Sequence, residues 1–172
     1  MPHASRITNP PGRSLTPIEV LVVESNPVDA QKTLTQFRAA GLTNGQHSVL
    51  EGEDALRYLR REGPHADARV PDLIFLDLLL PKMSGLRALK VIKSTPALMH
   101  VPVVVAAESD DVRFVQAACS LSAHGFIRKP AELIDFLRSI EPCYEYWISV
   151  VTLNSKARGG DQSSVTSAAR LM

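Results

Sequence analysis

Asp77 closes an apolar run, Leu73-Ile74-Phe75-Leu76, and stands just before a turn that contains Pro81 and Gly85. In open α/β sheets, ligands bind and chemistry takes place outside the carboxyl ends of the strands. A carboxylate in this place can act as a nucleophile. It can also be no more than a helix cap or a loop residue. The other strand ends must therefore be considered with it.

Two further strand ends carry ionisable residues. Glu24 follows the first predicted strand, and Lys129, with Pro130 after it, follows the last one. Because such ends converge on one face of a doubly wound sheet, we expect Glu24, Asp77 and Lys129 to meet. A purely structural interpretation remains for each neighbour: Glu24 as a helix cap, Lys129 as a surface residue with its stem on apolar surface, and Phe126 as core.

Parallel strands joined by crossover helices are predicted to position these residues. Short β-branched or Leu-rich runs alternate with segments of helical periodicity. The predicted strands cover residues 18–23, 46–50, 73–76, 103–106 and 125–127, and the predicted helices cover 27–40, 53–61, 86–94 and 110–122. Strands one, three and four are almost continuously apolar, as expected of strands covered on both faces, whereas 46–50 is polar enough for an edge. The fold class is therefore α/β, with a five-stranded, doubly wound parallel sheet.

The composition favours one folded domain with two polar ends. The chain has 172 residues, with 19 Lys and Arg against 18 Asp and Glu, and a chain of this length can bury one sizeable core. Residues 1–16 and 155–172 are rich in small polar residues, Pro or Gly and lack a helix or strand period, so we predict that they are disordered. Residues 17–154 remain as the domain.

Several function classes are disfavoured by the same composition. The net charge is only +1 and no long basic run is present, which argues against a nucleic-acid surface. The apolar runs are strand-sized and the first residues lack a signal-peptide core, so we expect a soluble cytoplasmic protein without a membrane partner. Cys119 and Cys143 lie far apart in helix-like segments, and we expect buried or half-buried thiols rather than a disulfide or metal pair.

A helical region is predicted to extend the domain after the last strand. It covers residues 131–140, meets Pro142, and restarts over 144–153, because proline kinks a helix or begins a new one. The second segment contains Tyr146, Trp147 and Val150 and is too apolar for a solvated tail. It either packs against a second copy of the chain in a C₂ dimer or folds back on its own domain.

Four segments, taken together and in order, resemble the receiver domain of two-component response regulators, which is CheY-like. They are Val22-Val23-Glu24-Ser25-Asn26-Pro27, residues 76–85, Val101-Pro102-Val103-Val104-Val105, and Gly125-Phe126-Ile127-Arg128-Lys129-Pro130. The resemblance implies strand order 2-1-3-4-5 and a stand-alone receiver. More narrowly, Arg60-Arg61-Glu62-Gly63-Pro64, Pro96-Ala97-Leu98 and Trp147-Ile148-Ser149-Val150-Val151 resemble single-domain regulators that partner phytochrome-type histidine kinases.

This resemblance implies a phosphoryl switch rather than an enzyme. Asp77 would accept a phosphoryl group from a phosphohistidine of a sensor kinase, and Lys129 would bind an oxygen of that group. Mg²⁺ would be held by Glu24, Asp77 and the backbone oxygen of Leu79.

Two prolines have places in the same resemblance. Pro81 would shape the loop after Asp77, and the peptide bond between Lys129 and Pro130 would be cis, as it is in this family.

Two departures from the family put efficient phosphorylation in doubt. Receivers carry a second acid after strand one, where this chain has Ser25, so one metal-binding charge is missing and Mg²⁺ affinity should fall. After strand four the family has Thr or Ser, where this chain has Ala107. The lost hydroxyl couples phosphorylation to the strand-five aromatic, here Phe126, which itself lacks a tyrosine hydroxyl.

Glu108 is an unexpected addition, because a small residue usually stands there. Its carboxylate is expected either to turn inward and pair with Lys129, replacing part of the missing negative charge, or to remain a solvated loop acid that caps the helix beginning near Asp110.

Two functions remain open. The first is a receiver that accepts phosphate on Asp77 and signals through partner or dimer contacts that include Tyr146, Trp147 and Val150. The second is a phosphorylation-poor receiver that serves as a constitutive interaction or dimerisation module. Asp77, Lys129 and Glu24 favour the first function, whereas Ser25, Ala107 and Glu108 favour the second.

Overall fold

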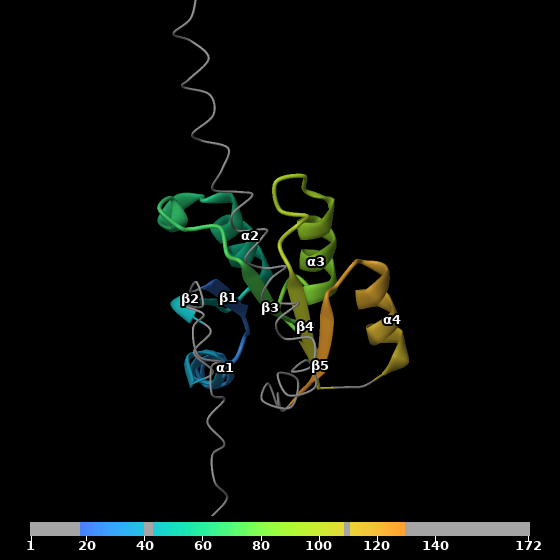
Figure 1. Cartoon of the computed structure of the whole chain (residues 1–172). Coiled ribbons are helices and arrows are strands. Elements are labelled where there is room, and N and C mark those ends of the chain that lie inside the picture. Colours follow the sequence, from blue (N-terminus) through green and yellow to red (C-terminus); the bar gives the residue numbers. More distant parts are fainter. Residues whose placement is uncertain (1–17, 40–42, 109–110, 130–172) are drawn as a thin grey trace, which may run out of the picture.

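A computed structural model of the chain describes residues 18–39, 43–108 and 111–129 (Figure 1). The disordered arms predicted at 1–16 and 155–172, the helical segments 131–140 and 144–153, Cys143 and Pro130 lie outside the described residues. The predicted contacts of Tyr146, Trp147 and Val150 lie outside them as well.

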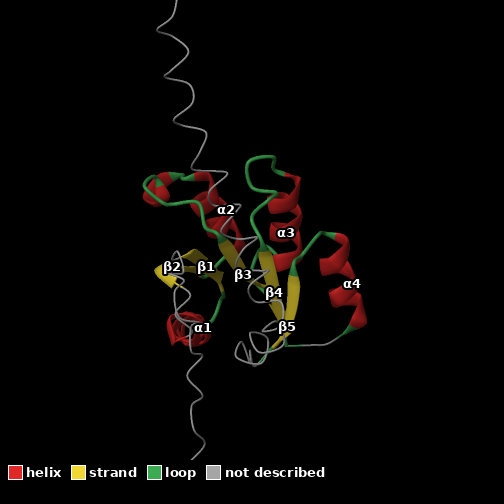
Figure 2. Cartoon of the chain, viewed as in Figure 1, coloured by secondary structure: helices red, strands yellow, loops and turns green. Residues whose placement is uncertain are grey.

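Five parallel strands form one sheet with the order β2-β1-β3-β4-β5, as predicted. The strands are β1 (Ile18–Val23), β2 (Thr43–Val49), β3 (Leu73–Asp77), β4 (Val103–Ala107) and β5 (Gly125–Arg128). The helices are α1 (Pro27–Ala39), α2 (Gly52–Arg60), α3 (Gly85–Ser94) and α4 (Val112–Ser120), with a short 3₁₀ helix, η1 (Gly63–His65). Within the described part of the chain, helices alternate with strands and cover the sheet (Figure 2).

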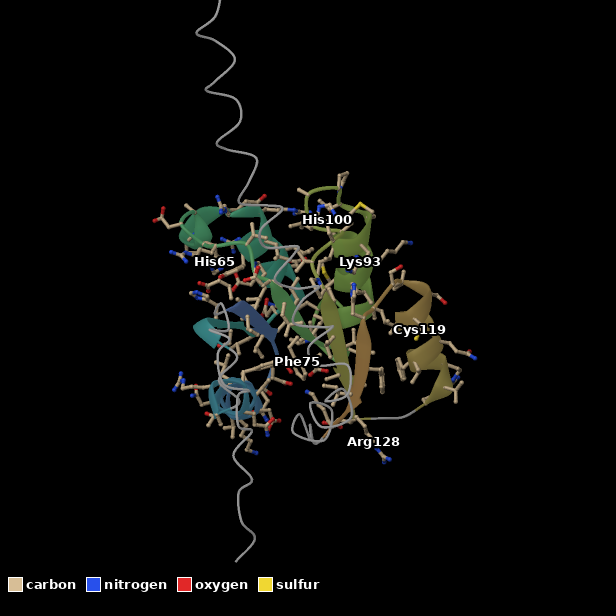
Figure 3. The ribbon with its side chains drawn as sticks, viewed as in Figure 1. His65, Phe75, Lys93, His100, Cys119 and Arg128 are labelled. Carbon is tan, nitrogen blue, oxygen red and sulfur yellow. The ribbon has the colours of Figure 1, made fainter. Side chains whose placement is uncertain are left out.

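The two faces of the sheet are covered by different helices. In Figure 1, α1 lies on one side of the sheet, whereas α2, α3 and α4 lie on the other. Successive strand residues point to opposite faces. Phe75, which is labelled in Figure 3, therefore meets Phe37 of α1 edge to face, with ring centroids 6.2 Å apart. Its neighbours Ile74 and Leu76 join the core under α2 and α3.

The central strands are buried along their whole length. Every residue of β3 and β4 is buried, which confirms that their continuous apolar runs are strands covered on both faces. β2 lies at an edge, as its polar sequence predicts, but it begins at Thr43 rather than at residue 46. Thr43 and Gly45 pair with β1, and the register shifts between them at Asn44. Asn and Gly have little intrinsic preference for β-structure.

The helix boundaries differ from the predicted ones by one or two residues for local reasons. Arg61 adopts a left-handed conformation, with φ of 58°, and ends α2. The Asp111 carboxylate accepts a hydrogen bond from the Arg113 N–H and caps α4, which therefore begins at Val112 rather than at residue 110. The 3₁₀ helix η1 was not predicted.

The strand register brings three chain segments together at the carboxyl ends of the strands. Val23 of β1 is level with Leu76 of β3, Asp77 with Ala106 of β4, and Ala107 with Arg128 of β5. The residues that follow β1, β3 and β5 therefore emerge together.

Cys119 is exposed on α4, so the expectation of a buried or half-buried thiol is wrong for this residue. Within the described ranges, no helix combines the length and the apolar character needed to cross a bilayer.

Candidate functional site

Asp77 ends β3 as a buried carboxylate at the shared edge of the sheet; only 3% of the residue is exposed. Its Oδ1 accepts a hydrogen bond from the Leu79 N–H at 2.8 Å. The backbone continues the sheet for one more residue, because the Leu78 N–H donates to the Ala106 carbonyl at 2.9 Å. The carboxylate is therefore fixed by its own loop, as in other Asx turns.

Gly85 allows α3 to begin directly against this strand end. A Cβ atom at Gly85 would lie 2.1 Å from the Asp77 carbonyl oxygen and 2.6 Å from the Leu78 Cα. The Gly85 N–H donates to the Leu78 carbonyl at 3.0 Å, and the Ser84 side chain caps the helix by accepting from the Arg87 N–H. The sequence marks Gly85 as a turn residue, but its supporting role behind Asp77 was not predicted.

Glu24 follows β1 and is buried, with 2% exposed. Its Oε1 accepts from the Asn26 N–H at 3.0 Å. The cap of α1 is Asn26, whose Oδ1 accepts from the Val28 N–H at 2.9 Å. The helix-cap interpretation of Glu24 is therefore wrong, since its other oxygen points to the lysine described next.

Lys129 joins the two carboxylates. Its Nζ donates to Asp77 Oδ2 at 2.6 Å and also to Glu24 Oε2, and its backbone N–H donates to the Ala107 carbonyl at 2.7 Å. Only 12% of the lysine side chain is exposed. The predicted meeting of Glu24, Asp77 and Lys129 is thus present in the structure, and Lys129 is not a surface residue.

Burial and charge oppose each other in this triad. Burial raises the pKa of Glu24 and outweighs its hydrogen bonds to Lys129 and Asn26, which favour the ionised form. Burial also lowers the pKa of Lys129, but the hydrogen bonds to Asp77 and Glu24 dominate and leave it raised. The lysine therefore stays protonated, and the ionised triad carries one net negative charge.

The loop after Asp77 is exposed and is tied to the start of α2. Leu79 is 53% exposed, and the Pro81 carbonyl accepts from the Met83 N–H at 2.6 Å. Lys82 has a positive φ of 62° and pairs with Glu51 at 2.8 Å. Pro81 thus takes part in a tight turn of the loop that follows Asp77.

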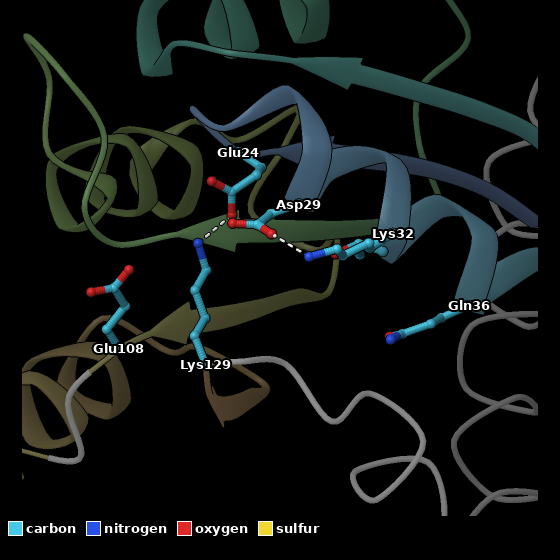
Figure 4. A pocket seen from close by; sticks show the side chains of 7 residues that line it. Glu24, Asp29, Lys32, Gln36, Glu108 and Lys129 are labelled. Atoms are coloured by element: carbon cyan, nitrogen blue, oxygen red, sulfur yellow. Dashed lines mark hydrogen bonds and ion pairs between the residues drawn. The ribbon is translucent and has the colours of Figure 1, made fainter.

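The residues at the ends of β4 and β5 take different environments. Ala107 is buried, and Phe126 is half-buried against the core under α2 and α3. Glu108 is exposed and lines a pocket of about 440 Å³ whose walls also include Lys32, Glu24 and Lys129 (Figure 4).

The predicted ion pair between Glu108 and Lys129 is not formed, because Lys129 is bound to Glu24 and Asp77 instead. Glu108 is exposed, as the alternative of a solvated loop acid predicts, but it does not cap α4, since Asp111 caps that helix.

The oxygen donors at the site suit a hard divalent cation, but they are few. Glu24 and Asp77 supply two carboxylates on either side of Lys129, and Leu79 follows with its backbone oxygen. Mg²⁺ is usually held by one or two carboxylates together with neutral oxygens and water. Ser25, half-buried beside Glu24, adds a neutral hydroxyl where a third carboxylate would add charge. The donor set therefore fits Mg²⁺, but it carries less negative charge than a set with a third carboxylate would.

Comparison with known proteins shows which family the chain belongs to. The chain is 28% identical to the response regulator Rcp1 of Synechocystis sp. over 137 residues, covering 80% of this chain and 93% of Rcp1. The Mn²⁺-bound structure of Rcp1 superposes with a TM-score of 0.66. The phosphorylated cyanobacterial phytochrome response regulator RcpA is 33% identical, with a TM-score of 0.67, covering 78% of this chain and 96% of RcpA.

A third solved structure is the bacteriophytochrome response regulator AtBRR. It is 32% identical, with a TM-score of 0.64, and the match covers 73% of this chain and 91% of AtBRR. Residues 20–141 match the response regulator receiver domain. This range includes Glu24, Asp77 and Lys129. The chain is a member of the response regulator receiver family and is related to the phytochrome-associated regulators.

Proposed function

We propose that the chain is a stand-alone receiver that accepts a phosphoryl group on Asp77 from a phosphohistidine of a sensor histidine kinase. The observation that supports this most directly is the convergence of Asp77, Glu24 and Lys129 from three strand ends at one buried position. A carboxylate nucleophile with an ammonium group beside it combines the attacking group of phosphoryl transfer with positive charge for the phosphoryl oxygens.

The transfer forms a bond between an Asp77 carboxylate oxygen and phosphorus and breaks the bond between phosphorus and the histidine nitrogen. The electron pair of the broken bond remains on the imidazole of the kinase. The Leu79 N–H holds Oδ1 of Asp77, and Lys129 holds Oδ2. When Asp77 Oδ2 is bonded to phosphorus, Lys129 is placed to bind a phosphoryl oxygen instead.

Glu24, Asp77 and the backbone oxygen of Leu79 would hold Mg²⁺ in this site. When bound, Mg²⁺ would supply positive charge against the phosphoryl oxygens. Ser25 lowers the fixed negative charge available for this purpose, and we therefore propose a weakened metal site. A bound divalent ion and Lys129 would both bind the Glu24 carboxylate.

A second function is supported by specific residues. Ala107 is buried at the end of β4 and has no hydroxyl to offer a phosphoryl oxygen. The missing hydroxyl, Ser25, and the binding of Lys129 to both Glu24 and Asp77 together favour a phosphorylation-poor receiver that works as a constitutive interaction module. The two functions differ in whether Asp77 carries phosphate during signalling.

The proposed partners follow from the family relationship. Rcp1, RcpA and AtBRR are phytochrome-associated or closely related regulators, so a phytochrome-type histidine kinase in the cytoplasm is the proposed phosphodonor. We also propose a homodimer that uses Tyr146, Trp147 and Val150, without nucleic acid or membrane as a partner. Trp147→Ala should lower the association constant measured by sedimentation. A change in monomer stability alone would instead indicate that this segment folds back on its own domain.

Transfer from a kinase tests the proposed function. A phytochrome-type kinase is phosphorylated with labelled ATP and mixed with wild-type protein, Asp77→Asn or Asp72→Asn. Asp72 is a matched control, because its carboxylate binds the Glu19 N–H at the other end of β3. Label is expected on wild type and Asp72→Asn but not on Asp77→Asn. Equal labelling of all three proteins would contradict Asp77 as the acceptor.

A further inference from the structure

The buried N–H of Val103 has an unusual acceptor. Val103 lies at the amino end of β4, whereas Asp77 lies at the carboxyl end of β3. Val103 is the first residue of β4 and is fully buried. It precedes the first paired position of β4 and β5, which is Val104 with Gly125. Its N–H donates to the ring Nδ1 of His124 at 3.3 Å, and its carbonyl accepts from the His124 N–H at 2.8 Å. One histidine therefore holds both backbone groups of Val103.

This geometry requires one protonation state of the imidazole. A backbone N–H can only donate, so Nδ1 of His124 must carry a lone pair, and the ring proton of the neutral form must sit on Nε2. When the ring takes up a second proton, both nitrogens become donors. The Val103 N–H then loses its acceptor in a buried position, which is a strongly unfavourable state for a backbone amide.

The charged neighbour of His124 is Lys93 on α3. Its Nζ donates to the carbonyls of Val101 at 2.7 Å and Met99 at 3.1 Å, just before β4. Figure 3 shows Lys93 at one end of the sheet and Arg128, which ends β5, at the other. His124 as a residue is exposed, but the partial desolvation of its ring and the charge of Lys93 lower the pKa of His124 below its ordinary value of 6.5.

The other ionisable groups of the adjacent elements do not offset this charge. β4 contains only Val and Ala, and the ionisable residues of α4 are Arg113, which pairs with Asp111, and the exposed Cys119. His100, in the loop before β4, is exposed. A proton added to His124 therefore faces a lysine and meets none of these groups as a counter-ion.

We propose that His124 is a pH-sensitive latch between β4 and β5. The neutral imidazole fastens the start of β5 to Val103, and protonation in mildly acidic solution releases it. β5 has only four residues, so the two hydrogen bonds between His124 and Val103 are a large share of its attachment to the sheet. Lys129 follows the other end of β5, and the latch thereby connects pH to the mobility of the strand that positions this lysine. The inference rests on the fold and is independent of phosphorylation.

Amide hydrogen exchange on the full-length, unphosphorylated protein tests the latch. Exchange is measured between pH 5 and 7.5 by NMR and corrected for the intrinsic pH dependence of the rate. We expect the Val103 and Phe126 amides to lose protection on acidification, by about tenfold, while Ile74 in central β3 keeps its protection. The Val103 amide shift should follow the titration of the His124 ring.

Two substitutions separate the latch from a general effect of acid. In His124→Asn, the side-chain oxygen can accept from Val103 without titrating, so protection at pH 7.5 should remain and the pH dependence should disappear. His124→Ala should show weak Val103 protection at every pH. The proposal is overturned if Val103 is unaffected while His124 titrates in wild type, or if His124→Asn keeps the wild-type pH dependence.

Discussion

Lys129 donates a hydrogen bond to Oδ2 of Asp77 at 2.6 Å, although 52 positions separate the two residues in the sequence. The same Nζ binds Glu24, so one ammonium group holds two buried carboxylates together.

Removing the ammonium group should leave two buried carboxylates facing each other. Lys129→Met is expected to lower the free energy of unfolding by about 3 kcal/mol at pH 7, as for other broken buried ion pairs. Burial already raises the pKa of Glu24 above 4.5, and the loss of Lys129 should raise it further. The variant should therefore lose stability as the pH rises from about 4.5.

Urea unfolding with and without millimolar Mg²⁺ measures this effect. Mg²⁺ should restore more stability to Lys129→Met than to wild type, because the cation replaces the missing charge. Lys32→Met is the matched control, since Lys32 lines the same pocket but has an exposed side chain, which pairs with Asp29. A loss of stability equal to that in Lys32→Met would contradict the role given to Lys129.

Gly85 should tolerate no side chain. In Gly85→Ala, the Cβ would lie 2.1 Å from the Asp77 carbonyl oxygen, so α3 must move away from the strand end. We expect a loss of about 3 kcal/mol in unfolding free energy. Gly52→Ala is the control, since its nearest contacts, in Met83, are 3.3 to 3.4 Å away, and its change should stay within about 1 kcal/mol. Similar losses in both variants would argue against the close approach.

A hydroxyl at the end of β4 should strengthen the response to phosphorylation. In Ala107→Ser, the new group is expected to bind a phosphoryl oxygen, an interaction worth about 1.5–3 kcal/mol and a shift of one to two orders of magnitude in the population of the switched state. Phosphorylation should then change the NMR signals of Phe126 more than it does in wild type. Ala106→Ser is the control, because the preceding residue of a strand points to the other face. Equal responses of the two variants would refute the expected contact.

Lys93 should make stability depend on pH in the alkaline range. Burial lowers the pKa of Lys93 to about 8, below its ordinary value of 10.5, so the unfolded chain binds the proton more tightly. The free energy of unfolding of wild type should therefore rise relative to Lys93→Met between about pH 8 and 10.5. Chemical denaturation at several pH values measures this, and Lys90→Met, at an exposed position on the same helix, serves as the control. Parallel curves for wild type and Lys93→Met would contradict the prediction.

The strand ends could be predicted from the sequence because apolar runs end sharply there. Glu24 and Asp77 each end such a run, Lys129 follows the short strand Gly125–Arg128, and the parallel order then brings all three together at the carboxyl ends of the strands. The start of β2 could not be predicted in this way, because Asn44 and Gly45 have little strand preference and the segment is held by pairing with β1.

The partner of Lys129 also depends on information that the sequence does not contain. Glu24 and Glu108 are both acids that follow strands, and either is chemically suitable. The backbone bond from Lys129 to the Ala107 carbonyl fixes the register of β5 against β4, and the lysine then points to Glu24 and Asp77 while Glu108 stays exposed. Likewise, the acceptor role of the His124 ring depends on where β5 begins relative to Val103.

Phosphorylation by a small phosphodonor in the presence of Mg²⁺, followed by intact-mass measurement, tests the central claim most directly. We predict that wild type gains one phosphoryl group, that Asp77→Asn gains none, and that Ser25→Asp gains it faster because the added carboxylate strengthens the metal site. If wild type remains unmodified while Ser25→Asp is phosphorylated, the natural protein is a phosphorylation-poor interaction module. Equal modification of wild type and Asp77→Asn would contradict Asp77 as the phosphoacceptor.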